Sequence, residues 1–335
     1  MTPLVTIGIP VYKRLNCLPR ALQSVAHQDY PYIELLVSDN GLNGAAVRDL
    51  VAQYYNRAYV FRQNQAIVTL PAHYNQLVAA ASGKYFIWMP DDDSISPNYV
   101  SELVPILERD QKIAAAIARQ EYVDASGDIL RTSPDHAPHC ISGEQLIARW
   151  TAIGFESFTA ILARTEEIRA CGGYPEFPGG THCDDAVLIK LSLGRSIAFT
   201  NACAYQLQQD EASVGWSLKC EVLAEDTRRF LKFLDDDPWL LSFARQDVAR
   251  WADLKRSLMK MAWETYYYRW NTIYKERLSL APWVKAAFAL PYIVDYYRAV
   301  MFSLRYGVKA RLFRKAKAHL PWIHKLYQTI KCRTF

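Results

Sequence analysis

The first 120 residues alternate short apolar runs with stretches of helical spacing, and this alternation is the feature that most constrains the fold. The apolar runs, which predict strands, occupy residues 4–9, 33–37, 58–61, 85–89 and 113–118. The helical stretches between them occupy residues 15–27, 45–56, 72–81 and 97–108. Because strands that alternate with helices are joined by right-handed crossovers, we expect an α/β fold built on a mainly parallel sheet.

Polar clusters follow three of the predicted strands at the point where each strand ends. Tyr12–Arg14 follows the first strand, Ser38–Asn40 the second and Asp91–Asp93 the fourth. Open sheets of this kind bind ligands just beyond the carboxyl ends of their strands. We therefore expect the three clusters to converge on one edge of the sheet and to form a binding site there.

Three adjacent carboxylates at Asp91–Asp93 are the strongest chemical signal in the chain. Carboxylates at close range repel one another, and burial raises their pKa values further. A hard divalent cation with phosphate oxygens would relieve both penalties. A second triplet, Asp235–Asp237, lies between two helical patterns and follows no strand, so we interpret it as a solvated helix end.

The composition indicates a globular protein, because 51% of the residues are hydrophobic and 22% are charged. At about 150 residues per domain, this length favours about two domains. After residue 120 the pattern loosens, with a hairpin predicted around 125–128 and mostly helical spacing from about 213. Seven scattered cysteines without metal-ligand spacing favour core thiols in a reducing compartment, and the N-terminus shows no secretory signal.

The net charge of +5 conceals a strongly basic C-terminal segment. Residues 296–335 carry ten Lys or Arg and no Asp or Glu, which leaves residues 1–295 at −5. Aromatic side chains are interleaved with these charges, a combination that favours an anionic membrane surface over nucleic acid. A solvated helix face is the alternative interpretation. The longest uncharged apolar run nearby, residues 286–294, is far shorter than the about 20 residues of a membrane span, so we expect peripheral association.

Three segments in fixed order carry a resemblance to a known enzyme family. They are IGIPVYKRLNCLPRALQSVAHQDYPYIELLVSDN, ASGKYFIWMPDDDSISPNYV and GGYPEFPGGTHCDDAVLIKLSL. They resemble, in turn, the opening half, the acidic metal motif, and the Gly-Gly-aromatic loop with acidic pair of a family 2 glycosyltransferase. The resemblance implies a GT-A fold over residues 1–215, with a nucleotide-sugar half (1–119) and an acceptor half (120–215). A helical, basic-aromatic extension would occupy residues 216–335.

The resemblance also implies which side chains bind the donor. Tyr12 would stack beside the base or ribose, and Asp39 would accept a hydrogen bond from the imide N–H of the base, since an ionised carboxylate only accepts. The acidic triplet would contact the ribose and hold the metal. The full set implied for the nucleotide sugar is Pro10, Tyr12, Arg14, Asp39, Arg62, Asn75, Asp91 and Asp92.

The implied cofactor is Mn²⁺ or Mg²⁺ bridging the diphosphate. The family's first acid is missing here, and within the triplet we favour Asp93 as the metal ligand, with Asp92 next. Asp185 would be the general base and Asp184 its catalytic neighbour, because this pair matches the family's acidic pair at a helix start. A helix N-terminus favours the ionised form of such a carboxylate. His182 either helps to bind metal or acceptor, or is a turn residue.

The sequence therefore predicts an inverting glycosyltransferase that moves a sugar from a nucleotide-diphosphate donor to a saccharide or lipid-linked saccharide acceptor. The resemblance places it in bacterial surface polysaccharide assembly, and we expect it in the cytoplasm at the inner face of the cell membrane. One alternative is a non-catalytic protein that uses the basic tail to bind membrane or nucleic acid. Another is a sugar-nucleotide nucleotidyltransferase, which would need a Gly-rich phosphate loop after the first strand.

Overall fold

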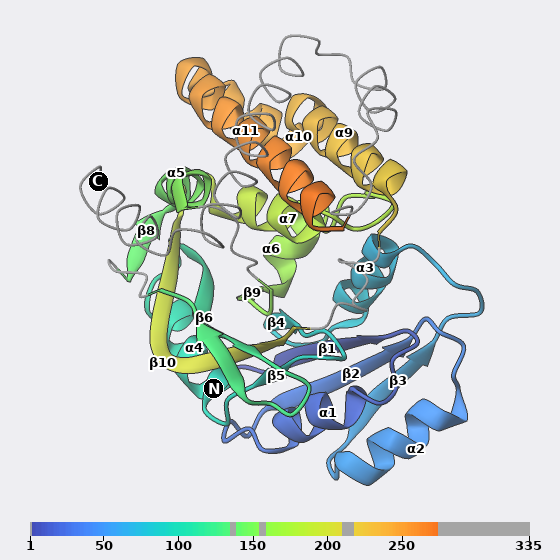
Figure 1. Cartoon of the computed structure of the whole chain (residues 1–335). Coiled ribbons are helices and arrows are strands. Elements are labelled where there is room, and N and C mark those ends of the chain that lie inside the picture. The colour runs from blue at the N-terminus through green and yellow to red at the C-terminus, as the bar shows by residue number, and fades with distance from the viewer. Residues whose placement is uncertain (1, 135–138, 154–158, 210–217, 274–335) are drawn as a thin grey trace, which may run out of the picture. The chain divides into compact units, whose positions relative to one another are not determined.

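The computed structural model describes residues 2–134, 139–153, 159–209 and 218–273, and the structural statements below refer to these. Contacts gather Met1–Arg269 into one compact unit, which contains a ten-stranded sheet with helices on both faces (Figure 1). The α/β prediction is confirmed. The boundary predicted at residues 215/216 falls in the segment 210–217, outside the described residues, and stays a prediction.

The strands form one mixed sheet in the order β3-β2-β1-β4-β9-β6-β10-β5, with β7 beside β6 and β8 beside β10. Their bounds are β1 Val5–Val11, β2 Ile33–Asp39, β3 Tyr59–Gln63, β4 Tyr85–Trp88, β5 Ser94–Ile95, β6 Ile113–Val123, β7 Ile129–Thr132, β8 Cys140–Ser142, β9 Leu162–Arg164 and β10 Ser196–Gln208. Strands β3, β2, β1 and β4 are mutually parallel, and β10 runs parallel to β6. Strand β9 is antiparallel to both of its neighbours.

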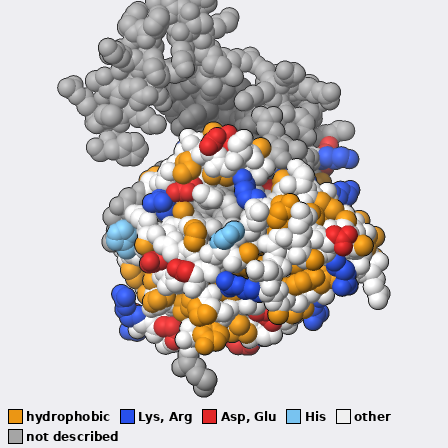
Figure 2. All heavy atoms as spheres, turned by 90° about the horizontal axis from the view of Figure 1, so that it is seen from below, with side chains coloured by type: hydrophobic (Ala, Val, Ile, Leu, Met, Phe, Trp, Pro, Cys, Tyr) orange, Lys and Arg blue, Asp and Glu red, His pale blue; other side chains and the backbone are white. Residues whose placement is uncertain are grey.

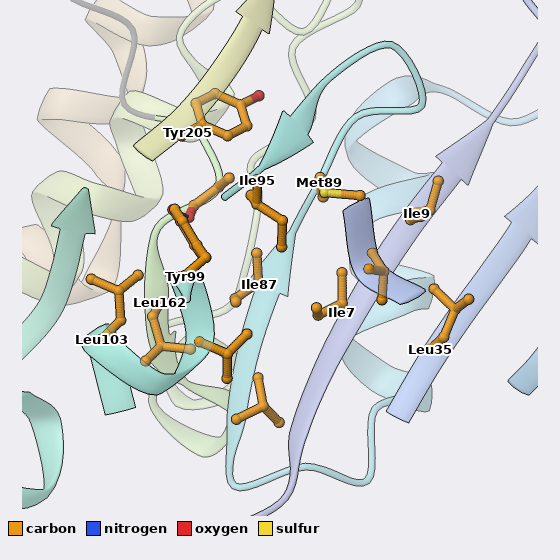
Figure 3. Packing of buried hydrophobic residues seen from close by; sticks show 14 of the residues in the cluster. Ile7, Ile9, Leu35, Ile87, Met89, Ile95, Tyr99, Leu103, Leu162 and Tyr205 are labelled. Atoms are coloured by element: carbon orange, nitrogen blue, oxygen red, sulfur yellow. Dashed lines mark hydrogen bonds between the residues drawn. The ribbon is translucent and has the colours of Figure 1, made fainter. Parts of the chain in front are cut away.

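Strand β1 lies inside the parallel half, and all seven of its residues are buried. Helices cover both faces of this half, so both sets of alternating side chains are buried: Val5, Ile7, Ile9 and Val11 lie in the core cluster, and the smaller Thr6, Gly8 and Pro10 lie on the other face. Figure 3 shows Ile7 and Ile9 of β1 with Ile87 of β4 in one buried cluster. A Cβ on Gly8 would lie 2.8 Å from the ring of Phe86, so the smallest residue is needed there.

Two sets of helices cover the two faces of the sheet. The helices are α1 Leu18–Ala26, α2 Ala45–Tyr54, α3 Leu70–Ala80, α4 Tyr99–Arg109, α5 Gly143–Ile153, α6 Thr165–Ala170, α7 Cys183–Ser192, α9 Cys220–Asp236, α10 Pro238–Ala244 and α11 Val248–Ile273. Helices α1, α2 and α4 bury apolar residues in the same core cluster. Helices α3, α6 and α7 lie on the opposite face (Figure 1).

The predicted elements of the first 120 residues are all present within a few residues of their expected bounds. The hairpin predicted around residues 125–128 is the turn between β6 and β7. The second acidic triplet is a helix end, as predicted: α9 ends at Asp236, and Asp237 accepts hydrogen bonds from Trp239 N (3.0 Å) and Leu240 N (3.1 Å) at the start of α10.

The basic tail predicted at residues 296–335 lies outside the described residues. None of the helices that the structure describes combines the length and apolar character that crossing a bilayer requires. Figure 2 views the molecule from the side of α1 and α2, and on that face the described basic and acidic side chains are interspersed.

Candidate active site

The acidic triplet occupies the turn between β4 and β5, and each of its carboxylates has different partners. Asp91 Oδ2 accepts from the Tyr12 backbone N–H (3.4 Å), and Asp92 Oδ2 accepts from the Arg14 guanidinium (2.5 Å). Asp93 accepts from the Tyr205 hydroxyl through one oxygen and from a β10 backbone N–H, that of residue 208, through the other (2.8 Å). All three are buried, so the triplet joins the loop after β1 to strand β10.

The fold places this turn at the carboxyl end of the parallel strands. Met89 N donates to Gly8 O (3.0 Å), which holds the start of the turn against β1. The side chain of Asn43, from the loop after β2, donates to Tyr12 O (2.6 Å). Residues from the ends of β1, β2 and β4 therefore meet at one edge of the sheet, where ligands bind in open α/β sheets.

The buried triplet is electrostatically unfavourable without a proton or a cation. Burial raises the pKa of Asp91 to about 7, and the charge of Asp92 adds to the rise while the Arg14 guanidinium opposes it. Burial also raises the pKa of Asp93 well above its ordinary value, and the Asp92 charge adds to it. Two of three adjacent carboxyl groups thus resist ionisation, which is the condition that a bound cation would relieve.

This electrostatic arrangement predicts that the metal-free protein loses stability as the pH rises. The folded state binds the Asp91 proton more tightly than the unfolded chain does. The stabilisation from Asp91 is therefore complete below about pH 4 and is lost as the pH rises through the folded-state pKa of about 7. Thermal melts in a chelator across this range should show a falling Tm, with a smaller fall in Asp91→Asn. Equal slopes for the two proteins would contradict the assignment.

Asp39 lies at the end of β2 and braces the loop that follows. Its Oδ1 accepts from Gly41 N (2.9 Å) and Asn43 Nδ2 (2.9 Å), and its Oδ2 accepts from Gly44 N (2.8 Å). A Cβ on Gly41 would overlap the carbonyl oxygen of Tyr12 at 1.7 Å, so this loop is seated directly on the loop after β1. Asp39 therefore fixes the relative position of two loops at the candidate donor site.

The remaining residues predicted to bind the donor lie at different distances from the triplet. Pro10 belongs to β1, opposite Ser38 of β2. Arg62 is an exposed residue of β3. Asn75 of α3 is clasped to Tyr174, donating to its carbonyl (2.8 Å) and accepting from its N–H (2.8 Å). The structure brings Tyr12, Arg14, Asp91 and Asp92 together, and in the described part of the chain no hydrogen bond or ion pair joins Arg62 or Asn75 to any of them.

The two aspartates that begin α7 face different surroundings. Asp185 is buried, and its Oδ2 lies 2.8 Å from His182 Nδ1, whereas its Oδ1 has no hydrogen-bond partner among the described residues. Asp184 is partly exposed and lines a small cavity with Trp88 and Tyr174. The two adjacent carboxylates thus have different surroundings: Asp185 is hydrogen-bonded to a histidine, and Asp184 lies beside two aromatic residues.

An aromatic cluster connects this pair to the acidic triplet. Tyr74 and Trp88 have ring centroids 3.9 Å apart, and Tyr174 packs edge-on against Tyr74 at 5.2 Å. Burial raises the pKa of Tyr74 well above its ordinary value, and the charges of both Asp184 and Asp91 add to the rise. Tyr74 therefore packs against Trp88, which ends the strand before the triplet, and Trp88 in turn lines the same cavity as Asp184.

Sequence reasoning missed this aromatic cluster as part of the site. Trp88 ends the strand before the triplet, and Tyr174 belongs to the Gly-Gly-Tyr loop, so both were adjacent to motifs and could have been considered. Tyr74 carries no comparable signal, because it is one aromatic residue within the helical pattern of α3.

The carboxylates of the triplet suit a divalent cation that is held partly by the protein and partly by phosphate oxygens of a bound substrate. No group of three His, Cys, Asp or Glu side chains within the described ranges is close enough to bind a metal ion. Mg²⁺ is often bound by one or two carboxylates together with substrate phosphates. Asp91 and Asp92 offer hard oxygen donors on the β1 side, whereas both oxygens of Asp93 accept from β10. The donor set fits a cation site that phosphate oxygens would complete.

Comparison with known proteins gives a consistent result. The family described as "Glycosyl transferase family 2" matches residues 6–170. An uncharacterized glycosyltransferase of Rickettsia conorii is 30% identical over 131 residues, which are 38% of this chain and 21% of that protein. Chondroitin synthase of Escherichia coli is 24% identical over 158 residues, covering 47% and 23%. The matched part of the chain spans between about a fifth and two fifths of the length of the Rickettsia relatives.

Two solved structures share the fold. Staphylococcus aureus TarS 1–349 in complex with UDP-GlcNAc aligns with a TM-score of 0.65 at 16% identity, covering 89% of this chain and 81% of that one. The mannosyltransferase PcManGT from Pyrobaculum calidifontis, in complex with GDP-Man and Mn²⁺, aligns with a TM-score of 0.53 at 14% identity, covering 95% and 85%. The GT-A fold prediction is confirmed.

Proposed function

Residues 6–170 of this chain belong to glycosyl transferase family 2, and from that premise we propose that the protein transfers a sugar from a nucleotide-diphosphate donor to a saccharide or lipid-linked saccharide acceptor with inversion. The observation that carries the proposal is the pair of buried carboxylates, Asp91 and Asp92, bound to the loop after β1 at the carboxyl edge of the sheet. A site that has these two carboxylates on the donor side and Asp185, which is hydrogen-bonded to His182, on the acceptor side would suit an in-line displacement.

The donor side is formed by the loops after β1, β2 and β4. Tyr12 is half-buried beside the triplet, with Lys13 Nζ 4.9 Å from its ring centroid, and the ring would stack on the base or ribose. Asp39 keeps the adjoining loop in place and would accept from the base. Arg14, already bound to Asp92, is a guanidinium suited to phosphate oxygens. Both solved neighbours were crystallised with nucleotide sugars, UDP-GlcNAc and GDP-Man, which supports this class of donor.

Asp91 and Asp92 would hold Mn²⁺ or Mg²⁺, and Mn²⁺ accompanies the donor in PcManGT. When bound, the cation would act as a Lewis acid that neutralises charge on the departing diphosphate. The contacts of Asp93 with β10 favour a structural role for it, so we now place Asp92 before Asp93 as the ligand. The side chains of the loops after β1 and β2 would orient the donor.

Asp185 would take the proton of the acceptor hydroxyl. Its Oδ2 is occupied by His182, and its Oδ1 has no partner among the described residues. An ionised carboxylate accepts through either oxygen, so Oδ1 is the atom available to the acceptor. Asp184 adjoins Asp185 and is partly exposed, so it would contact the acceptor sugar.

The acceptor and the place of action are inferred from the relatives and from the basic tail. The curated relatives include chondroitin synthase and a putative colanic acid biosynthesis glycosyl transferase of Escherichia coli, which supports a saccharide acceptor in surface polysaccharide assembly. The ten basic residues of the tail at 296–335 support work at the anionic cytoplasmic face of a membrane.

A thermal-shift panel of nucleoside diphosphates, each with and without Mn²⁺, tests the proposal. A ligand that binds only the folded state raises the Tm by mass action. We expect at least one nucleoside diphosphate to raise the Tm, and to do so more with Mn²⁺ than without it. If none of the panel shifts the Tm under either condition, the proposed donor site is wrong.

A further inference from the structure

Helix α9 lies beyond the residues that match the family and contacts the loop that leads into α7. Asp226 of α9 is fully buried, and its two carboxylate oxygens accept from Gly179 N (2.9 Å) and Thr181 N (2.9 Å). One side chain of α9 therefore holds two backbone amides of this loop. The loop is residues 179–182, and it is called the base loop below because it directly precedes Asp184 and Asp185.

The base loop and α9 are in such close contact that a larger residue would not fit between them. A Cβ on Gly179 would lie 2.7 Å from Asp226 Oδ2 and 2.8 Å from Val222 Cγ1. Contacts under 3.0 Å to buried atoms force a displacement, so the loop is seated on the helix rather than merely near it.

His182 ends the base loop under an aromatic ring of the same helix. Its ring and that of Phe230 have centroids 4.7 Å apart with an angle of 32° between their planes. The His182 side chain is fully buried, its Nδ1 lies 2.8 Å from Asp185 Oδ2, and its Nε2 has no hydrogen-bond partner among the described residues. Its backbone adopts φ +68°, a left-handed conformation that glycine and asparagine adopt readily and that few other residues adopt.

The buried Nε2 and the left-handed backbone of His182 both lower the stability of the folded state, and a loop with a purely structural role would not require either. An unpartnered buried nitrogen and a left-handed non-glycine residue both persist only where surrounding contacts enforce them, and such costs concentrate at functional sites. The contacts run from α9 through His182 and end at Asp185, the carboxylate assigned to the acceptor proton. The contacts thus constrain Asp185, the side chain whose orientation matters for transfer.

We propose that α9 is the positioning element for the general base: Asp226 fixes the base loop, Phe230 holds the His182 ring, and His182 directs Asp185 so that Oδ1 faces the acceptor. The inference rests on the proposed function, and it adds residues 182, 226 and 230 as positioning residues outside the family match. A carboxylate held in one orientation gains rate because its alignment is already set before the acceptor arrives.

The test uses variants of α9 in the full chain, with matched controls on the same helix. Asp226→Asn and Phe230→Leu disturb the contacts with the base loop. Thr227→Val alters a buried neighbour whose hydroxyl donates to Leu223 O of its own helix. Phe233→Leu alters an aromatic residue that contacts Phe177, Phe230 and Lys190 and, within the described part of the chain, makes no ring contact with His182. We expect kcat for transfer to fall about 10- to 100-fold in the first pair, with donor KM little changed, and both controls to stay near wild type.

Replacing His182 separates positioning from packing. In His182→Asn, the amide nitrogen stands near the former Nδ1 and asparagine tolerates the left-handed backbone, so kcat should stay much closer to wild type than in His182→Leu. Hydrogen–deuterium exchange of the Gly179 and Thr181 amides gives a readout that needs no activity. Both amides should exchange slowly in wild type and faster in Asp226→Asn.

The outcomes distinguish this inference from the proposed function. If wild type transfers sugar and Asp226→Asn or His182→Leu transfers equally fast, α9 does not position the base. If the Thr227 and Phe233 controls lose as much kcat as Asp226→Asn and Phe230→Leu do, the loss reflects a general disturbance of packing and the inference is also wrong. If the Gly179 and Thr181 amides are protected but wild type shows neither nucleotide binding nor transfer, the proposed function is wrong. The catalytic role of α9 is then wrong too, although its contact with the base loop stands.

Discussion

Asp185→Asn is expected to lower kcat for sugar transfer by about 10²- to 10⁴-fold, the usual contribution of a general base. The side chain keeps its size, and its amide oxygen can still accept from His182 Nδ1, so the fold around α7 should be preserved. The amide has no lone pair basic enough to take the acceptor proton. The loss should therefore appear in turnover, while the affinity for a nucleoside diphosphate with Mn²⁺ stays close to that of wild type.

The measurement is paired with Asp184→Asn, a neutralisation of the adjacent residue. Asp184 lines the cavity beside Trp88 and Tyr174, so its loss should raise the acceptor KM more than it lowers kcat. Unchanged turnover in Asp185→Asn, together with a large loss of kcat in Asp184→Asn, would move the base role to Asp184. Binding of the nucleotide, measured by calorimetry, confirms that both variants keep an intact donor side.

The parallel half of the fold could be predicted because its signals are local. Strand β1 has large apolar residues at every second position and no charged residue since both faces of it are covered, and α1 shows helical spacing since only one face is buried. Strand β9 gave no such signal. It is three residues long and includes Arg164, whose buried guanidinium donates to the carbonyl oxygens of Leu107 and Ile113, groups that are more than 50 residues away in sequence.

The location of the acidic triplet could be predicted, but the direction of each carboxylate could not. Placement after a strand is a local property, and it distinguishes Asp91–Asp93 from the helix end at Asp235–Asp237. The partners of Asp93 are Tyr205 and the residue 208 backbone on β10, which lie more than 100 residues away. Only the folded sheet, in which β5 pairs with β10, shows that Asp93 faces away from the loop after β1.

The role of His182 illustrates the same limit. Beside a Gly-rich loop, a histidine is as compatible with a turn as with a ligand. What distinguishes the two is the contact of its ring with Phe230 and the hydrogen bonds that Asp226 accepts from the preceding amides. Those residues belong to α9, and the helical spacing of α9 indicates an amphipathic helix without indicating which loop it will meet.

Asp92→Asn should abolish the extra stabilisation that Mn²⁺ gives to a bound nucleoside diphosphate and lower kcat by about 10²- to 10³-fold, as loss of a charge-stabilising group does. In Asp93→Asn, by contrast, both the Mn²⁺-dependent stabilisation and kcat should stay much closer to wild type. Burial already raises the pKa of Asp93 well above its ordinary value, so asparagine resembles the protonated form. Its amide oxygen can accept from the residue 208 N–H, and its nitrogen can donate to the Tyr205 oxygen.

The comparison of these two variants decides which carboxylate meets the cation. Isothermal titration with Mn²⁺ and the nucleoside diphosphate found by the panel would give both affinities, and Asp235→Asn in the exposed triplet is the matched control that should change nothing. Loss of the Mn²⁺ dependence in Asp93→Asn, with Asp92→Asn unaffected, would restore the sequence-based choice of Asp93. It would also mean that the Asp93 carboxylate leaves Tyr205 when the donor binds. Loss in Asp92→Asn alone assigns the cation to the β1 side of the turn, where Arg14 and Tyr12 already converge on the neighbouring carboxylates.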